Sequence, residues 1–207
     1  MESLDELLRK AEVAHGHLCA GQILGVRMAL LGLGRLGIAD PHGADRKRLV
    51  TYVEIDRCAT DAIALVTGCR LGKRALKFRD WGKMAATFVD LAAVDGGSGR
   101  GMRVVALENS RELARQLYPD IENKSRQQMM AYRELADEQL FSAQWVRVNI
   151  GPAEMPGNKG DRFLCPRCGE GVNFGRFEEI AGERLCRSCA RPELRYWTAD
   201  EPEPGPH

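Results

Sequence analysis

The chain lacks both a long uninterrupted apolar run and a strong charge of either sign. Its most apolar stretch, residues 18–38, is interrupted by Gln22, Arg27 and Arg35, so we expect a buried helix there and no membrane span. The 30 basic and 29 acidic residues leave a formal net charge of +1. This balance argues against partners held mainly by electrostatics, namely nucleic acid or an anionic membrane surface.

A secretory leader and a complete disulfide framework are also missing. The N-terminal MESLDELLRK is acidic and amphipathic, whereas a signal peptide has a basic start followed by an apolar segment. Seven cysteines cannot all pair, and four of them form two CxxC pairs. This pattern is typical of metal binding in a reducing compartment, so we expect a cytoplasmic protein.

Length and composition predict one full domain, residues 1–155, and a small appendage. With 44% hydrophobic residues, the first part is able to bury a core of its own. Helix patterns are found at about 4–14, from near His17 to Leu36, and at 58–67, 110–118 and 123–141, and strand patterns at 50–55, 74–78, 84–90, 102–107 and 145–150. Five strands with helices before, between and after them indicate an α+β fold.

Glycine and proline mark the remaining boundaries. Residues 151–157 have the composition of a linker, a metal module is expected at 160–198, and residues 199–207 are expected to be a disordered tail. The glycine-rich segment Gly96–Gly101 lacks the Lys-Ser/Thr of a phosphate-binding loop, which favours a hairpin turn. The basic run Arg46–Arg48 is interpreted as a solvated loop.

The appended module carries the strongest chemical signal. Seventeen residues separate the pair Cys165/Cys168 from the pair Cys186/Cys189. Each CxxC turn aims two sulfurs at one ion, so the two pairs fill the four positions of a structural zinc and leave none open. So short a segment needs such a staple, since structural zinc contributes roughly 10–16 kcal/mol in small finger peptides. The alternative is a redox CxxC or two unrelated thiol pairs.

The finger is expected to be a treble clef or a zinc ribbon, because Pro192 suits the first turn of a short helix. From Phe163 to Thr198 it contains six Arg and five Glu. No basic face is evident, so protein contact or self-association is favoured over nucleic acid.

A second set of ligand-type residues lies near the N-terminus. His15, His17 and Cys19 fall within five residues, and Cys58 and Asp61 begin a predicted helix. Imidazole and thiolate both bind zinc and similar metals. We predict that His17, Cys19 and Cys58 hold zinc or another transition metal, that His15 or Asp61 orients or completes the site, and that one position stays open.

Two residues of this region keep alternative interpretations. His15 is either a ligand or a helix-end residue that supports one. Cys69 follows Cys58 by eleven residues, about 16 Å along a continuous helix, so it ranks below Cys58 as a ligand. It is otherwise a small buried hydrophobe, or a thiol near Lys73.

Three segments together resemble a known family. They are His15-Gly-His-Leu-Cys-Ala-Gly-Gln-Ile-Leu-Gly25, Val53-Glu-Ile-Asp-Arg-Cys-Ala-Thr-Asp-Ala-Ile63 and Val66-Thr-Gly-Cys-Arg-Leu-Gly-Lys73. They are similar to the FmdE family of formylmethanofuran dehydrogenase components over residues 10–150, and some members carry a C-terminal zinc finger. Ala20 stands where many relatives have proline, and Thr60 where many have valine, but neither change removes a ligand.

The resemblance implies a thioredoxin-like core with a mixed five-stranded sheet and a metal or redox site built from His15–Cys19 and Cys58. It also implies a link to molybdenum- or tungsten-dependent formylmethanofuran dehydrogenase and methanogenesis. We therefore expect an accessory metal-binding protein of anaerobic one-carbon metabolism, oxidoreductase-associated if enzymatic, and a homodimer. The alternatives are a thiol oxidoreductase that cycles Cys19 and Cys58, or a zinc-finger regulator with a ligand-sensing core.

Overall fold

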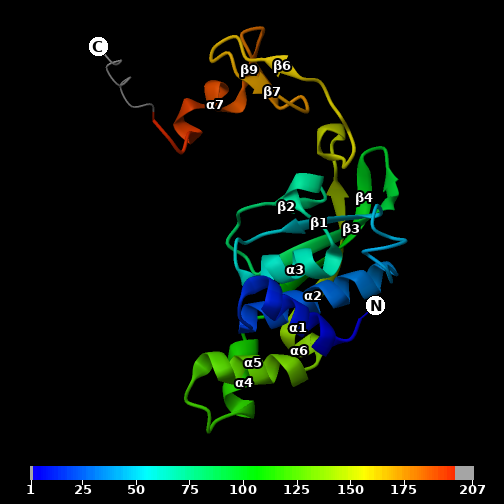
Figure 1. The fold of residues 1–207 in the computed structure, drawn as a ribbon, viewed down its shortest axis with the longest axis vertical. Coiled ribbons are helices and arrows are strands. Elements are labelled where there is room, and N and C mark those ends of the chain that lie inside the picture. Colours follow the sequence, from blue (N-terminus) through cyan, green and yellow to red (C-terminus); the bar gives the residue numbers. More distant parts are fainter. Residues whose placement is uncertain (1, 199–207) are drawn as a thin grey trace. The chain divides into compact units, whose positions relative to one another are not determined.

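The computed structural model describes residues 2–198 and divides into two compact units, with the boundary between Gly157 and Asn158 (Figure 1). The expected tail at 199–207 lies outside the described residues. The helices of the first unit are α1 (Leu4–His15), α2 (Ala20–Leu36), α3 (Cys58–Thr67), α4 (Ser110–Leu117), α5 (Lys124–Glu134) and α6 (Asp137–Leu140), with 3-10 turns η1 (Leu71–Lys73) and η2 (Pro152–Glu154). Its strands are β1 (Leu49–Val53), β2 (Leu76–Phe78), β3 (Ala85–Asp95), β4 (Ser98–Ala106) and β5 (Phe141–Asn149).

The five strands form one mixed sheet in the order β2-β1-β3-β4-β5. The β1–β2 pair is parallel and is connected through α3, while the other three pairs are antiparallel. This confirms the α+β class and the mixed five-stranded sheet. The hairpin between β3 and β4 turns at Gly96 and Gly97, which both have positive φ. The two strands therefore extend well beyond their predicted ends and include most of the glycine-rich segment.

Alternation along the strands divides the apolar residues between the two faces of the sheet. On one face Leu49, Phe88 and Val104 join the buried residues of α1–α6 in the main core. On the other face Val50, Tyr52, Val89 and Ile150 form a smaller cluster. Within residues 2–198 no helix is long and apolar enough to span a membrane.

Residues 151–157 are not the free tether that their composition predicts. Met155 packs against the smaller cluster, and the carbonyl oxygen of Glu154 accepts a hydrogen bond from Lys77 Nζ at 2.6 Å. Arg74 donates to the carbonyl of Ala153. The segment is therefore bound to the first unit by contacts that no local composition encodes.

Helix α1 begins as its sequence predicts. Ser3 and Glu6 form the reciprocal capping box, which satisfies two N–H groups at the helix start. At the other end Gly16 adopts φ 90°, a left-handed conformation that costs glycine little. The chain thus leaves α1 sharply just after His15.

Helix α2 packs closely against α3 and the sheet through two of its glycines. A Cβ on Gly25 would lie 2.4 Å from the carbonyl oxygen of Ala59 in α3, and one on Gly32 would lie 2.1 Å from the Phe88 ring. The expected close approach is therefore confirmed, but its partners lie within the chain. Helix α2 also begins at Ala20 and not near His17, which leaves Cys19 as its N-cap.

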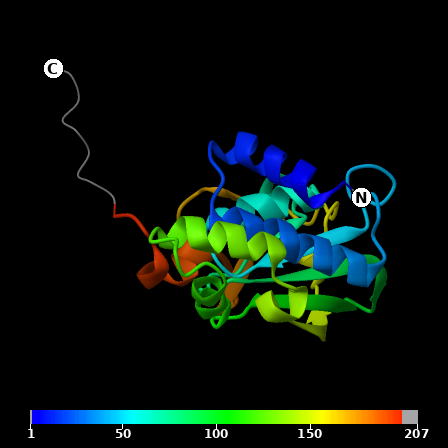
Figure 2. The same cartoon turned by 90° about the horizontal axis from the view of Figure 1, so that it is seen from below.

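The long helix predicted at 123–141 is broken into α5 and α6 by a residue from α2. Arg27 donates to the carbonyls of Tyr132 and Leu135 at 2.9 and 2.5 Å and pairs with Asp137 at 2.6 Å. Its cation thus satisfies the last carbonyls of α5, which a helix end leaves without internal partners. Figure 2 shows α5, in green, alongside α2, in blue.

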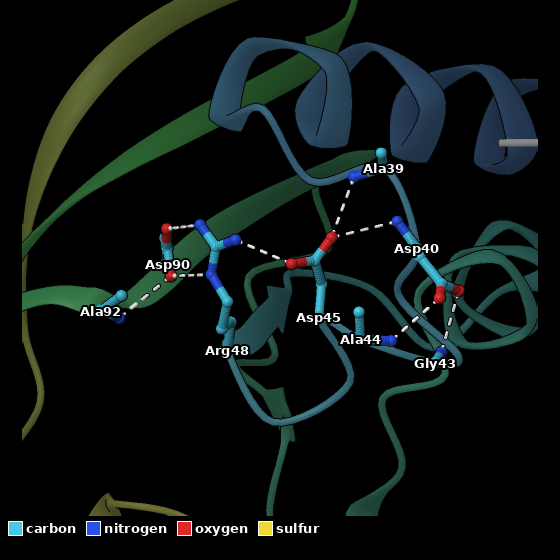
Figure 3. A network of polar contacts seen from close by, with 8 residues as sticks. All are labelled: Ala39, Asp40, Gly43, Ala44, Asp45, Arg48, Asp90 and Ala92. Carbon is cyan, nitrogen blue, oxygen red and sulfur yellow. Dashed lines mark hydrogen bonds and ion pairs between the residues drawn. The ribbon is translucent and has the colours of Figure 1, made fainter.

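The loop from α2 to β1 is held by a polar network (Figure 3). Asp45 accepts backbone hydrogen bonds from Ala39 and Asp40, both at 3.1 Å. The Arg48 guanidinium lies between Asp45 and Asp90. Hydrogen bonds to these carboxylates, Asp90 first, raise the pKa of Arg48 above its usual value, so the network is charged at any ordinary pH.

The second unit consists of two small hairpins and a short helix. Its elements are β6 (Phe163–Leu164), β7 (Gly171–Val172), β8 (Phe177–Ile180), β9 (Glu183–Cys186), α7 (Arg187–Ala190) and the 3-10 turn η3 (Pro192–Leu194). Strands β6 and β7 pair with each other, as do β8 and β9. Its buried cluster is Cys165, Leu185, Cys186 and Cys189, so sulfur is a large part of its interior.

Candidate metal centres

The four cysteines of the second unit converge. Their sulfur atoms all lie within 4.8 Å of one another, and those of Cys168 and Cys186 are 3.8 Å apart. Four sulfurs placed tetrahedrally about zinc at 2.3 Å would be about 3.8 Å apart. The donor set therefore fits a structural zinc, and it is an all-sulfur set with no position for a substrate.

Local structure explains how the two pairs reach this point. The first pair lies on the turn joining β6 to β7, where Gly169 adopts φ 74° and donates to the Cys165 carbonyl at 2.8 Å. In the second pair, Cys186 is the N-cap of α7 and Cys189 lies inside that helix. A cysteine turn, a hairpin and a helix that carries the last ligand follow one another, which is the arrangement of a treble clef.

Polar groups around the sulfurs affect the thiols unequally. The backbone N–H of Cys186 donates to the Cys165 sulfur at 3.4 Å, and this hydrogen bond lowers the pKa of Cys165 to about 6. Burial raises the pKa of Cys189 to about 12, although Arg195 approaches its sulfur at 3.5 Å. A bound cation would compensate this burial, because metal ligation favours the thiolate.

A second group of ligands forms where α1 ends and α2 begins. Ligand atoms of His15, His17 and Cys19 lie within 4.8 Å of one another, and the two imidazole rings are 5.0 Å apart. His15 is the last residue of α1, His17 lies in the connecting segment, and Cys19 caps α2. The turn at Gly16 is what folds this short segment into a cluster.

Asp61 and Cys58 reach the cluster from α3. Asp61 Oδ2 is 3.0 Å from His15 Nδ1, the arrangement by which a carboxylate orients a metal-binding imidazole and leaves the other nitrogen for the metal. The Cys58 thiol contacts the Cys19 thiol; burial first and this contact second raise the pKa of Cys58. The structure thus places all five predicted residues together, with His15 in the tight group and Cys58 beside it.

Close packing of the two helices brings their N-termini together. A Cβ on Gly21 would lie 3.3 Å from Cys58 Cβ and 3.7 Å from Cys19 Sγ, so a glycine there leaves room for the thiol pair. Both sulfurs lie at helix starts, where the macrodipole favours negative charge. The site therefore combines one buried thiol, one thiol at a helix cap and two imidazoles, a donor set that fits zinc or a related transition metal.

Cys69 lies away from this group. It follows the C-terminal end of α3, whereas Cys58 is the first residue of that helix, and ten helical residues span about 15 Å. Its side chain is buried among Thr51 and Leu49.

Gln22 is a supporting residue that the sequence interpretation did not assign to the site. Its side chain is fully buried, and Nε2 donates to the Cys58 carbonyl at 2.8 Å. Its Oε1 has no hydrogen-bond partner in the described structure, so an acceptor remains next to the Cys58 backbone. The available signal was a lone amide within an apolar helix, one turn after Cys19.

Fold and site together define a metal-ligating α+β protein with a small four-cysteine unit. The family model described as "FmdE, Molybdenum formylmethanofuran dehydrogenase operon" matches residues 14–144. The chain belongs to this family, and the match covers the whole His/Cys group.

Two known proteins are similar to the chain. A tungsten formylmethanofuran dehydrogenase (FmdE)-like protein from Syntrophus aciditrophicus has the same fold, with a TM-score of 0.59, 23% identity and coverage of 94% of this chain and 95% of that one. A probable S-adenosyl-L-methionine-binding protein from Archaeoglobus fulgidus is 38% identical over 87 residues. That alignment covers 42% of this chain and 24% of the relative, so the chain matches about a quarter of that protein's length.

Proposed function

We propose that the protein is an FmdE-like metal-binding accessory protein whose core unit holds a zinc or related transition metal in the His/Cys group. The observation that carries this is the clustering of His15, His17 and Cys19 within 4.8 Å with Asp61 on His15. Cys58 supplies a further thiolate when its proton is displaced. A metal held there supplies a Lewis acid, while the four-cysteine unit has a structural role.

The physiological setting follows from the family name alone. We propose an association with molybdenum- or tungsten-dependent formylmethanofuran dehydrogenase in anaerobic one-carbon metabolism. Co-purification from an anaerobic host that contains the enzyme would test it. Recovery of the chain free of that enzyme, with formylmethanofuran oxidation unchanged on its deletion, would count against it.

Metal content tests the core site directly. Protein purified anaerobically in reductant should contain two equivalents of metal per chain. The double change Cys19→Ser with His17→Ala should leave one, and Cys165→Ser with Cys168→Ser should also leave one, because each removes a different site. A single equivalent in the unchanged chain that is lost only with the second pair would refute a core site.

Cobalt substitution separates the two sites by their ligands. The four-cysteine site should show strong sulfur-to-cobalt charge-transfer absorption, and the core site a weaker band because it has fewer sulfurs. Loss of the weaker band in the Cys19→Ser chain assigns it to the core.

A thiol redox function is the second candidate, favoured by the contact between the Cys19 and Cys58 thiols. Here the two thiols would form one disulfide, releasing two protons and passing two electrons to an external disulfide. Catalytic disulfide reduction by metal-free protein, abolished by Cys58→Ser, would favour this candidate. A metal-free chain that does not turn over a disulfide would exclude it.

Assembly is a separate proposal. We propose a homodimer in which each four-cysteine unit contacts the partner's core unit. The glycine face of α2 does not support it, because α3 and Phe88 occupy that face at Gly25 and Gly32. Light scattering at micromolar concentration tests the proposal, and a monomer unaffected by loss of the four-cysteine unit's fold would contradict it.

A further inference from the structure

The third segment of the family resemblance, residues 66–73, has no part in the His/Cys group, yet it lines a cavity of its own. This cavity has a volume of about 600 Å³ and lies at the C-terminal end of α3, beside Gly68, Cys69 and Lys73. It is therefore at the opposite end of α3 from Cys58. Its size is within the range of small-molecule sites.

The floor of the cavity is apolar. It is formed by Leu49, Ala75 and Leu91 together with Cys69, which is 2% exposed. Thr51 donates to the Cys69 sulfur at 3.5 Å, and the thiol lies 3.7 Å from the Leu49 carbonyl. Burial raises the pKa of Cys69, so at neutral pH this residue offers a neutral surface to a bound molecule.

The rim of the cavity is cationic. Arg46 and Lys47 lie on the α2–β1 loop and Lys73 on η1, and all three are exposed. In the part of the chain that the structure describes, none of them forms an ion pair. The nearest acid of the loop, Asp45, is already engaged by Arg48 and two backbone N–H groups (Figure 3).

The loop network also fixes where the rim charges stand. Arg48 is anchored to Asp90 on β3, and Leu91 N–H donates to the Arg48 carbonyl at 2.5 Å. The loop that carries Arg46 and Lys47 is thus tied to the strand that supplies part of the floor. The C-terminal end of α3 contributes about half a negative charge here, which is less than three cations supply.

We propose that this cavity binds a small organic anion, with its carboxylate or phosphate on Arg46, Lys47 and Lys73 and its apolar body on the floor. Three cations without an acidic partner, above an apolar, neutral floor, favour a molecule that carries both features. The proposal is independent of the metal at the His/Cys group.

Amide NMR of the full, zinc-loaded chain tests the site with defined probes. Phenyl phosphate or benzoate should shift the amides of Gly68, Cys69 and Lys73 saturably, and comparing the two identifies the preferred anion. Benzyl alcohol, which lacks the charge, and inorganic phosphate, which lacks the apolar body, should bind at least about tenfold more weakly, a difference of about 1.4 kcal/mol.

Charge variants complete the test. Lys73→Gln should weaken phenyl phosphate about threefold, and combining it with Arg46→Gln and Lys47→Gln should abolish the shifts without lowering the melting temperature. Lys124→Gln, an exposed lysine at the start of α5, is the matched control and should leave binding unchanged. Shifts should persist in Cys19→Ser, which separates this site from the metal site.

Three results would overturn the proposal. They are unmoved cavity amides with both organic anions, equal binding by the triple variant, and benzyl alcohol or inorganic phosphate binding as tightly as phenyl phosphate.

Discussion

The two units hold their ligands in opposite relations to their cores. In the second unit the cysteines are three of the four residues of the buried cluster, so the ligands and the core are nearly the same atoms. In the first unit His15, His17 and Cys19 stand at a helix junction beside a large core that does not need them. The comparison teaches that a closed site supports its fold, whereas the open site is supported by one.

The largest effect is expected where ligand and core coincide. Cys165→Ser, or prolonged chelation, should unfold residues 158–198, because too little apolar surface remains to replace the ion. Amide NMR should show loss of dispersion for that unit while signals of residues 2–157 stay in place, which serve as the internal control. A folded second unit without metal would break the comparison.

The first unit should instead depend on its buried polar contacts. Glu54 is 2% exposed and accepts two hydrogen bonds from Arg103, each at 2.7 Å. Arg103→Met leaves that carboxylate buried without its partner and should lower the free energy of unfolding by about 3 kcal/mol. Urea denaturation followed by far-UV circular dichroism measures the change.

The matched variant restores the balance. Adding Glu54→Leu to Arg103→Met should recover most of the loss, because no buried charge then remains. A double variant as unstable as Arg103→Met would show that packing, and not the ion pair, was at stake.

A smaller effect distinguishes the two core-unit cysteines. Cys19→Ser should weaken core metal binding at least about tenfold without unfolding, since a hydroxyl is a poorer ligand than a thiolate. Cys69→Ser should leave metal affinity unchanged and cost about 1 kcal/mol of stability, because it places a more polar group in a buried position.

Competition with a chromophoric chelator and thermal unfolding measure these two quantities. The reverse ordering, with Cys69→Ser losing metal and Cys19→Ser losing stability, would move the site to the other end of α3.

The smallest effect concerns the orientation of His15. Asp61→Asn removes the carboxylate that lies 3.0 Å from Nδ1 and should weaken core metal binding about tenfold. Asp56→Asn, on the segment just before α3, is the control and should leave affinity unchanged. Equal losses in the two variants would indicate a general charge effect.

Local chemistry was readable in the sequence. The capping box at Ser3, the helix from Cys58 to Thr67 and the pairing of four cysteines are encoded within a few residues, because hydrogen bonds and metal turns there join near neighbours. The same is true of the glycines at 96 and 97, whose positive φ makes the hairpin turn. The family segments added the correct sheet.

What the tertiary structure decided rests on contacts between distant residues. Arg27 ends α5 from more than a hundred positions away, Lys77 binds residue 154, and Gln22 reaches the Cys58 backbone. Likewise, the sequence predicted the five residues of the His/Cys group but not that His15 joins the tight cluster, nor that Cys69 faces another cavity. Those assignments depend on how α2 and α3 pack, because a side chain's partners are set by the crossing of whole helices and not by its own neighbours.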